Sequence, residues 1–365
     1  MPVTFLGLDI GLFLLDFIVF TALYAAIALS LNLEFGYTGI PNFGKALFVM
    51  AGASLSSAFV GAFSVWLLRL HGDFIRNNTT MYPQITAILQ QSVGLSLGVL
   101  AISLIVAAAG GALLGYLASY PAIRLKTDYL AMFLFAVAMF GQVFVMNYAP
   151  FVGGQLGIGL PDLYAWAGNY EYLVSASMFV LLAVAVYIFS ERIARSPLSR
   201  VLRAIRDNES ASEALGKDVV AIRKRTFVIS SAISGIAGAL YAFYTLNVQA
   251  LTFDRLPWTF WPFVMVILGG AANNTGVMVG VFVFWIIVKG IDLLKFSFQS
   301  YVPFSVTWIE YLLIGGMIIL VLYMKPEGIL KEKPTTTLGT ARLSSIYATF
   351  RSRKESLESN AEKNK

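Results

Sequence analysis

Long apolar stretches without charged residues constrain this chain more than any other feature. A transmembrane helix needs about 20 mainly apolar residues to cross the hydrocarbon core of a bilayer. Nine stretches approach or reach that length, at residues 12–33, 43–67, 93–119, 129–149, 172–190, 226–247, 257–270, 276–294 and 307–324. Residues 257–270 are the shortest stretch and contain Pro257 and Pro262. The pattern predicts an all-α integral membrane protein, a polytopic helical bundle of about nine spans with glycine-rich breaks.

The rare residue types exclude several kinds of chemistry. Charged residues make up 13% of the chain, about half the share of a soluble domain. The absence of cysteine excludes disulfides, thiolate metal sites and thiol nucleophiles. His71 is the single histidine, and no G-x-x-x-x-G-K-[ST] segment is present to bind ATP. We therefore predict no catalytic residue, no metal site and no cofactor.

The acidic residues of the apolar stretches fall toward the ends of the predicted spans. They are Asp16, Glu34, Asp128, Asp292 and Glu310. A carrier driven by protons or sodium usually places carboxylates or histidines near the middle of the bilayer. The sequence thus shows neither an ATPase nor an obvious ion-coupling relay, and something else is expected to drive a pathway through it.

Basic clusters set the expected orientation. Residues 191–225 carry nine lysines and arginines, and loops rich in these residues stay in the cytoplasm. Counting spans from this loop places the N-terminus outside and the basic tail inside, provided that 257–270 crosses the membrane. These clusters also account for the net charge of +6, so no nucleic-acid partner is predicted.

The same pattern predicts the organisation of the chain. Residues 1–330 form a transmembrane domain that includes the cytoplasmic loop 191–225, and 331–365 form a basic, partly disordered cytoplasmic tail. Within the tail, helical spacing of apolar residues predicts a helix on the inner leaflet, through Leu343, Ile346, Tyr347 and Phe350.

Three glycine-rich polar breaks interrupt the apolar pattern, at residues 36–44, 153–161 and 269–276. Irregular backbone at membrane depth is tolerated where it is buried in protein or lines a cavity, and such interruptions often mark a transport pathway. We expect the pathway at Gly36, Tyr37, Gly39, Asn42, Gly153, Gly154, Gly157, Gly269 and Gly270. For any single break, a plain connecting loop is an equally good interpretation.

Residues 196–216 of the cytoplasmic loop predict an amphipathic helix. Ser196 is a suitable cap before Pro197, and Gly216 is a suitable end. Apolar residues (Leu198, Leu202 and Ile205) share one face, and charged residues (Arg203, Arg206 and Glu209) share another. Composition alone favours a helix that lies on membrane lipid. The interspersed acids and the small residues Ala204, Ala211 and Ala214 leave a protein partner as the alternative.

These segments together resemble the LivM type of permease subunit of ABC importers for branched-chain amino acids. Similar segments follow in order over roughly residues 12–330, at 31–39, 124–131, 153–157, 202–216, 234–241, 268–280 and 325–329. The cytoplasmic motif is the most specific of them. It comprises Leu202, Arg203, Ala204, Ile205, Arg206, Asp207, Asn208 and Glu209, followed by Ala214, Leu215 and Gly216.

The resemblance implies a multi-pass subunit of the cell membrane that passes branched-chain amino acids through a dimeric pore. It implies a second homologous permease, two ATP-binding subunits on the cytoplasmic side and an external substrate-binding protein. It also implies that the motif from Leu202 to Gly216 is the helix that couples ATP hydrolysis to transport. The third break, richer in asparagine than the family pattern, keeps amides or urea open as substrates. The residues alone also leave a stand-alone carrier or channel, or a membrane scaffold, as alternatives.

Overall fold

The computed structural model describes residues 4–5, 8–122, 125 and 127–298, and short pieces at 311–312, 315–316, 319–320, 323, 327–332, 344–345 and 347. The chain divides into two compact units, Met1–Glu332 and Lys333–Lys365, and the helices and strands named below all belong to the first. Most of the predicted span 307–324 and most of the predicted tail helix lie outside the described residues.

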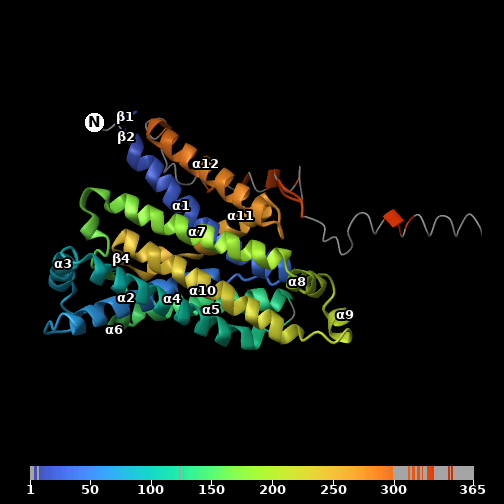
Figure 1. Cartoon of the computed structure of the whole chain (residues 1–365), viewed down its shortest axis with the longest axis horizontal. Coiled ribbons are helices and arrows are strands. Elements are labelled where there is room, and N and C mark those ends of the chain that lie inside the picture. The colour runs from blue at the N-terminus through green and yellow to red at the C-terminus, as the bar shows by residue number, and fades with distance from the viewer. Residues whose placement is uncertain are drawn as a thin grey trace, which may run out of the picture. The chain divides into compact units, whose positions relative to one another are not determined.

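Helices make up nearly all of the described structure (Figure 1). The α-helices are α1 (Ile10–Leu31), α2 (Lys45–Leu67), α3 (Asn78–Leu89), α4 (Val93–Ala122), α5 (Thr127–Asn147), α6 (Ala149–Val152), α7 (Glu171–Arg195), α8 (Pro197–Asp207), α9 (Glu209–Ala214), α10 (Val219–Thr245), α11 (Trp261–Gly269) and α12 (Asn274–Phe298). Two π-helical segments, η1 (Asn32–Tyr37) and η4 (Leu256–Phe260), and two 3₁₀ segments, η2 (Ala165–Tyr170) and η3 (Ala250–Phe253), extend or join them.

Four two-residue strands form two small antiparallel pairs. Strand β1 (Thr4–Phe5) pairs with β2 (Leu8–Asp9), and β3 (Ile158–Gly159) pairs with β4 (Asn247–Val248). Ile158 lies opposite Val248 in the second pair. This pair ties the second glycine-rich break to the loop after α10, which are far apart in the sequence.

The described residues confirm a polytopic helical membrane protein. Seven helical segments are long and apolar enough to span a bilayer: Gly11–Tyr37, Lys45–Leu67, Val93–Pro121, Asp128–Asn147, Ala165–Arg195, Val219–Thr245 and Asn274–Asp292. The stretch predicted at 257–270 forms the shorter apolar helix Leu256–Gly269. Pro257 stands in its first turn, where no backbone N–H bond is lost, and Pro262 stands where the π-helical segment η4 passes into α11.

Close backbone contacts hold the centre of the bundle together. Helix α10 packs against α2 and α4, while α1 packs against α7 and α12. A Cβ atom on Gly52 would lie 2.1 Å from the carbonyl oxygen of Gly235, and one on Gly238 would lie 1.9 Å from that of Val49. Glycine therefore sets the spacing of α2 and α10, as small residues do between helices in membranes.

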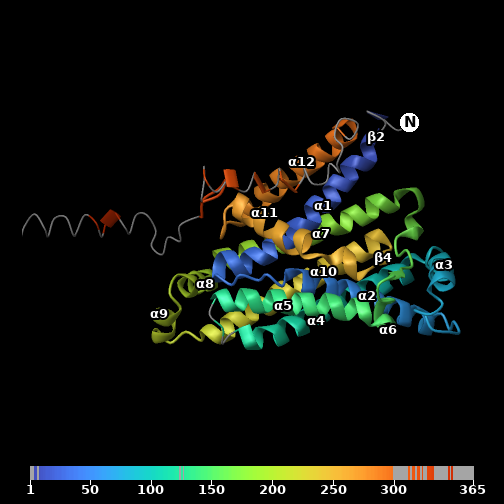
Figure 2. The same cartoon turned by 180° about the vertical axis from the view of Figure 1, so that it is seen from behind.

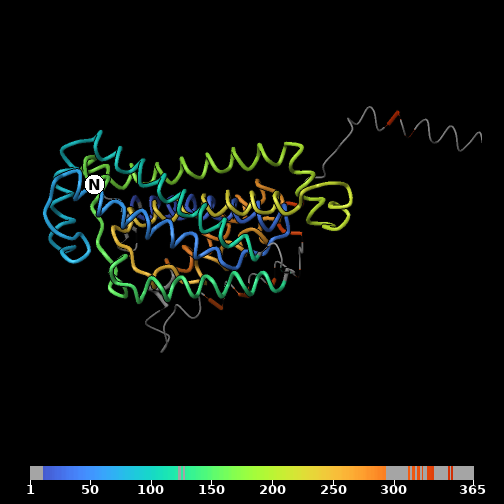
Figure 3. Tube along the Cα trace, turned by 90° about the horizontal axis from the view of Figure 1, so that it is seen from below, coloured from blue at the N-terminus to red at the C-terminus, as the bar shows by residue number. Residues whose placement is uncertain are grey.

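The long helices run alongside one another between two distinct ends (Figure 3). Helices α8 and α9 lie at one end, and α3, α6 and the β3–β4 pair lie at the other (Figures 1 and 2). The three glycine-rich breaks lie at these two ends, and the position of each break decides which parts of the chain it contacts.

Candidate functional site

The first and third breaks meet at the α8 end of the bundle. The side-chain amide of Asn32 donates to Asn274 Oδ1 at 3.0 Å, and the backbone N–H of Ala272 donates to Asn32 Oδ1 at 2.8 Å. A Cβ atom on Gly36 would lie 2.6 Å from the backbone nitrogen of Ala272. Five predicted pathway residues therefore gather here, namely Gly36, Tyr37, Gly39, Gly269 and Gly270.

The first break begins later than the sequence pattern indicates. The helix does not end at residue 33 but continues through Tyr37 as the π-helical segment η1, whose wider turn carries Gly36 against the third break. The chain then turns at Gly39, where φ is +72°, a value that suits glycine because it has no Cβ. The backbone N–H of Ile40 closes the turn on the carbonyl oxygen of Glu34 at 2.9 Å.

A fully buried ion pair fixes this break to its surroundings. Lys45 Nζ lies 3.2 Å from Glu34 Oε2, and neither side chain is exposed. Asn42 donates to both carboxylate oxygens of Glu34, at 3.1 and 3.2 Å, and Lys45 donates to the hydroxyl of Ser230 at 2.5 Å. The side chain of Asn42, a predicted pathway residue, is thus hydrogen-bonded to Glu34. Sequence reasoning identified Glu34 as an acid near the end of a span but missed its partner Lys45.

The C-terminal part of the first unit covers the third break. Gly270 adopts φ +111°, and a Cβ atom there would lie 2.1 Å from the carbonyl oxygen of Leu330. The backbone N–H of Ile329 donates to Leu268 O at 2.9 Å, and that of Leu330 donates to Gly269 O at 3.0 Å. Residues 328–332 therefore add a short hydrogen-bonded strap to the break.

Two arginines of α8 contact the first and the third break. Arg203 donates to the carbonyl oxygen of Ala272, in the third break, at 3.5 Å. Arg206 donates to the carbonyl oxygen of Gly36 at 2.8 Å, and the Arg203 guanidinium lies 5.4 Å from the ring centroid of Tyr37. Both arginines also pair with Glu332, at 2.8 Å from Arg203 and 3.1 Å from Arg206. Partial burial lowers the pKa of Arg206, but the neighbouring carboxylates outweigh it and raise that pKa overall.

The predicted coupling residues divide between two faces of α8 and α9. Leu202 and Ile205 are buried, and Glu209 pairs with Arg223 at 2.6 Å. The exposed residues are Ala204, Asp207, Asn208, Ala214 and Gly216. Leu198, predicted on the apolar face, is 43% exposed. The charged side chains Arg203 and Arg206 therefore point into the bundle, and the free surface is made mainly of small and polar residues.

The helix predicted over 196–216 is divided into two. Asn208 adopts an extended conformation, with φ −156° and ψ 105°, between α8 and α9. Its side chain accepts a hydrogen bond from the backbone N–H of Ala211 at 3.0 Å and so caps α9. Asparagine favours such a cap over a helix interior, which explains why the chain turns at this residue.

The second break forms a separate structure at the opposite end. Gly153, Gly154 and Gly157 all adopt positive φ, and a Cβ atom on Gly157 would lie 2.4 Å from the carbonyl oxygen of Val248. The Asn78 side chain exchanges two hydrogen bonds with the backbone of Gly159, at 2.8 and 2.9 Å. The structure thus places the predicted pathway residues in two groups, one at each end of the bundle.

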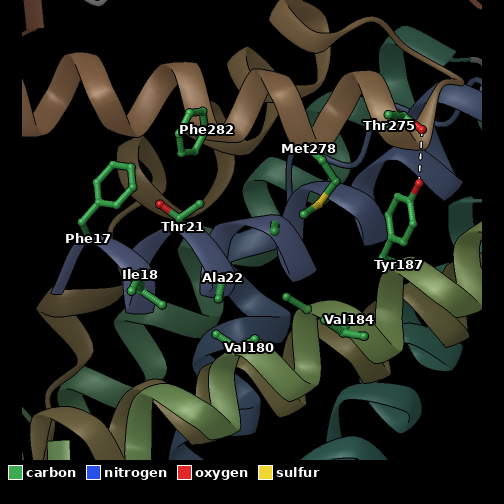
Figure 4. A pocket seen from close by; sticks show the side chains of 12 residues that line it. Phe17, Ile18, Thr21, Ala22, Val180, Val184, Tyr187, Thr275, Met278 and Phe282 are labelled. Atoms are coloured by element: carbon green, nitrogen blue, oxygen red, sulfur yellow. Dashed lines mark hydrogen bonds between the residues drawn. The ribbon is translucent and has the colours of Figure 1, made fainter. Parts of the chain in front are cut away.

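A cavity that the sequence pattern did not reveal lies between α1, α7 and α12 (Figure 4). It has a volume of about 480 Å³, and its lining is almost wholly apolar. Phe17 and Phe282 stand at one end with their rings edge to face, 5.8 Å between centroids. At the other end the hydroxyls of Tyr187 and Thr275 lie 3.2 Å apart. No sequence signal marks this cavity, since its lining residues come from three distant helices.

Comparison with known proteins places this geometry in a family. Residues 13–322 match the family model described as branched-chain amino acid transport system / permease component. The chain is 39% identical over 318 residues to the probable branched-chain amino acid transport permease protein LivM of Methanocaldococcus jannaschii, covering 86% of this chain and 92% of that protein.

Other relatives are more distant. The high-affinity branched-chain amino acid transport system permease protein LivM of Escherichia coli is 26% identical over 253 residues, 62% of this chain and 55% of that protein. The probable LivH permease of M. jannaschii is 24% identical over 323 residues, 86% of this chain and 90% of that protein. No solved structure matches the chain. The chain is a multi-pass protein of the cell membrane and belongs to the branched-chain amino acid transport system / permease component family.

Proposed function

We propose that this chain is a permease subunit of an ABC importer and forms part of the translocation pathway for branched-chain amino acids. The relatives named above are permeases of branched-chain amino acid transport. One structural observation carries the proposal. Arg203 and Arg206 of α8 contact the first break, the third break and Glu332 together, so a movement of α8 has a direct path to two breaks.

The exposed face of α8 and α9 is the proposed docking surface for an ATP-binding subunit. It presents Ala204, Asp207, Asn208 and Ala214, where small side chains allow close approach by a partner. The opposite face is buried in the permease through Leu202 and Ile205. A helix that is packed against the permease on one face and exposed on the other can transmit movement between two subunits.

The full assembly would contain this chain, a second homologous permease, two cytoplasmic ATP-binding subunits and an external substrate-binding protein. The pairing of permeases is supported by the likeness to both LivM and LivH proteins. In this assembly the chain supplies no ATPase site of its own. The second break, at the end of the bundle remote from α8, is the proposed gate toward the binding protein.

The topology that fits this function has nine spans in residues 1–330, the N-terminus outside, and loop 191–225 and tail 331–365 in the cytoplasm. The basic character of both segments supports it. Helix Leu256–Gly269 and the stretch 307–324 supply the two crossings beyond the seven long helices.

Uptake by reconstituted vesicles tests the proposal. The chain is assembled with its second permease and two ATP-binding subunits, and the binding protein and radiolabelled leucine are added outside. We expect leucine to accumulate only with ATP inside and the binding protein outside. Uptake of urea or an amide in place of leucine would contradict the substrate, and ATP-independent uptake by the chain alone would indicate a carrier or channel instead.

A further inference from the structure

The ion pair between Asp16 of α1 and Lys289 of α12 is accessible, in contrast to the Glu34–Lys45 pair. The Asp16 side chain is 33% exposed and that of Lys289 is 14% exposed, whereas Glu34 and Lys45 are fully enclosed. Tyr244 of α10 donates to Asp16 at 3.3 Å. Another charged group can approach the Asp16–Lys289 pair, because water can reach it. The Glu34–Lys45 pair has no such room, because it is fully buried and hydrogen-bonded to Asn42 and Ser230.

The accessible pair stands on the two helices that carry Phe17 and Phe282, which line the apolar cavity of Figure 4. Asp16 directly precedes Phe17 on α1. Lys289 follows Phe282 by seven residues, so Phe282 and Lys289 lie on the same side of α12, two turns apart. Phe17 and Phe282 form the near end of the cavity. The charged pair therefore lies toward the Phe17–Phe282 end of the apolar cavity.

Two polar groups, one of α1 and one of α12, have no hydrogen-bond partner within the described part of the chain. They are the hydroxyl of Thr21, which lines the cavity, and the indole N–H of Trp285. Trp285 lies one turn before Lys289, whose ammonium group is 5.8 Å from its ring centroid. Buried polar groups are normally satisfied in folded proteins, so these two leave hydrogen-bonding capacity that a polar ligand could use.

We propose that Asp16, Lys289 and Trp285 bind the charged end of a zwitterionic amino acid, and that the cavity between α1, α7 and α12 receives its apolar side chain. The substrate ammonium would face Asp16, and its carboxylate would face Lys289 and the indole N–H of Trp285. This inference rests on the proposed function and assigns a substrate site to it.

Charge balance explains why a zwitterion fits this place. Separating a partly buried ion pair is unfavourable unless each ion finds a new partner. A zwitterion brings one partner for each ion and leaves the net charge unchanged. An uncharged amide or urea brings neither, and an acyl chain would satisfy the apolar cavity but not the unpaired N–H and hydroxyl groups. The site therefore selects a free α-amino acid with an apolar side chain.

Ligand binding can be measured with the full chain in lipid nanodiscs. Tryptophan fluorescence is titrated with L-leucine, with leucinamide, which lacks the carboxylate, and with 4-methylpentanoate, which lacks the ammonium. We expect saturable binding of leucine, and binding of each analogue weaker by about tenfold or more, because each analogue lacks one charged group and loses its charge-assisted hydrogen bonds. Trp285→Phe should abolish the leucine-dependent change in fluorescence, while the other five tryptophans keep the basal emission. Equal affinity for all three compounds would overturn the proposal.

Matched variants separate binding from structure. Asp16→Asn and Lys289→Gln should each weaken leucine binding at least tenfold and lower leucine uptake by the reconstituted complex. Asp292→Asn removes an equal charge at 3.9 Å from Lys289 but keeps the closer Asp16–Lys289 contact, and it should bind leucine nearly as well as the wild type does. The exchanged double variant Asp16→Lys with Lys289→Asp should recover thermal stability but not leucine affinity, since the cavity keeps its place while the charges are reversed.

The outcomes also distinguish this inference from the proposed function. If Asp16→Asn and Lys289→Gln melt at lower temperature but bind and transport leucine normally, the pair only ties α1 to α12 and the inference is wrong while the function stands. Recovery of leucine affinity in the exchanged variant would likewise show that the pair is only a structural tie. If the wild-type complex transports urea and not leucine, the proposed function itself fails.

Discussion

In this membrane protein, contacts of individual side chains fix the conformation of the glycine-rich breaks. Glu34 and Lys45 are both fully buried, and each has its hydrogen bonds met, by Asn42 and by Ser230. A buried ion pair contributes little by itself, but removal of one partner leaves an uncompensated charge. The pair therefore acts mainly by fixing which way the first break turns.

Lys45→Met is expected to destabilise the folded chain by about 3–5 kcal/mol, because Glu34 then remains buried without a cation. Thermal melting in detergent measures the change. The double variant Glu34→Gln with Lys45→Met should melt at a higher temperature than Lys45→Met alone. As a control, Arg76→Met removes an ion pair to Asp73 whose arginine is 87% exposed, and it should leave the melting temperature nearly unchanged. An equal loss in both single variants would contradict the role given to the buried pair.

Gly270 is a second position where adding a single Cβ atom is expected to change stability. Gly270→Ala is expected to cost about 1–3 kcal/mol of stability, because the new Cβ meets Leu330 O in a backbone conformation that suits glycine. Gly94→Ala in α4 is the matched control, since nothing lies within 4 Å of its Cβ position, and there alanine should be neutral or slightly stabilising. The melting temperatures of the two variants test this prediction. An unchanged melting temperature for Gly270→Ala would show that the strap of residues 328–332 can move aside.

At the scale of elements, α8 lies between the breaks and the face proposed for docking. Its arginines contact the breaks, and its other face is exposed beside α9. The cap at Asn208 separates α8 from α9, so the proposed docking face is a bent surface and not one straight helix. Substitutions on the two faces should therefore have different consequences.

Arg206→Glu should lower leucine uptake by about tenfold or more while the ATP-binding subunits still copurify, because the change removes a charge-assisted hydrogen bond to Gly36 and repels Glu332. The exchanged pair, Arg206→Glu with Glu332→Arg, should recover part of the uptake. By contrast, Ala204→Trp should reduce copurification itself, since it fills the exposed face. Uptake assays and affinity purification of the complex measure both effects. Loss of copurification in Arg206→Glu would place that arginine at the partner surface instead.

At the scale of the whole molecule, the two ends of the bundle differ in construction. One end joins two breaks, α8 and the strap of residues 328–332, whereas the other joins the second break to β4 and Asn78. Lysines and arginines gather at 191–225. An importer needs this difference, because ATP-binding subunits dock on one side and substrate arrives on the other.

Cysteine labelling tests the orientation directly, because the natural chain has no cysteine. Arg76→Cys, in the loop before α3, and Lys217→Cys, between α9 and α10, are both exposed positions. A membrane-impermeant maleimide should label Arg76→Cys in intact cells and Lys217→Cys only after permeabilisation. The reverse pattern would invert the proposed topology and move the docking surface to the outside.

The class of fold, the positions of the long helices, the breaks and the family could all be predicted from the amino-acid sequence, because hydropathy, helix length and glycine content are local properties of the chain. Which residues lie beside one another depended on the folded structure. Folding turned Arg203 and Arg206 inward, split the helix at Asn208, joined Asp16 to Lys289 and opened a cavity between α1, α7 and α12. These contacts depend on how distant helices rotate and approach one another, and their close packing sets that geometry without leaving a local pattern in the sequence.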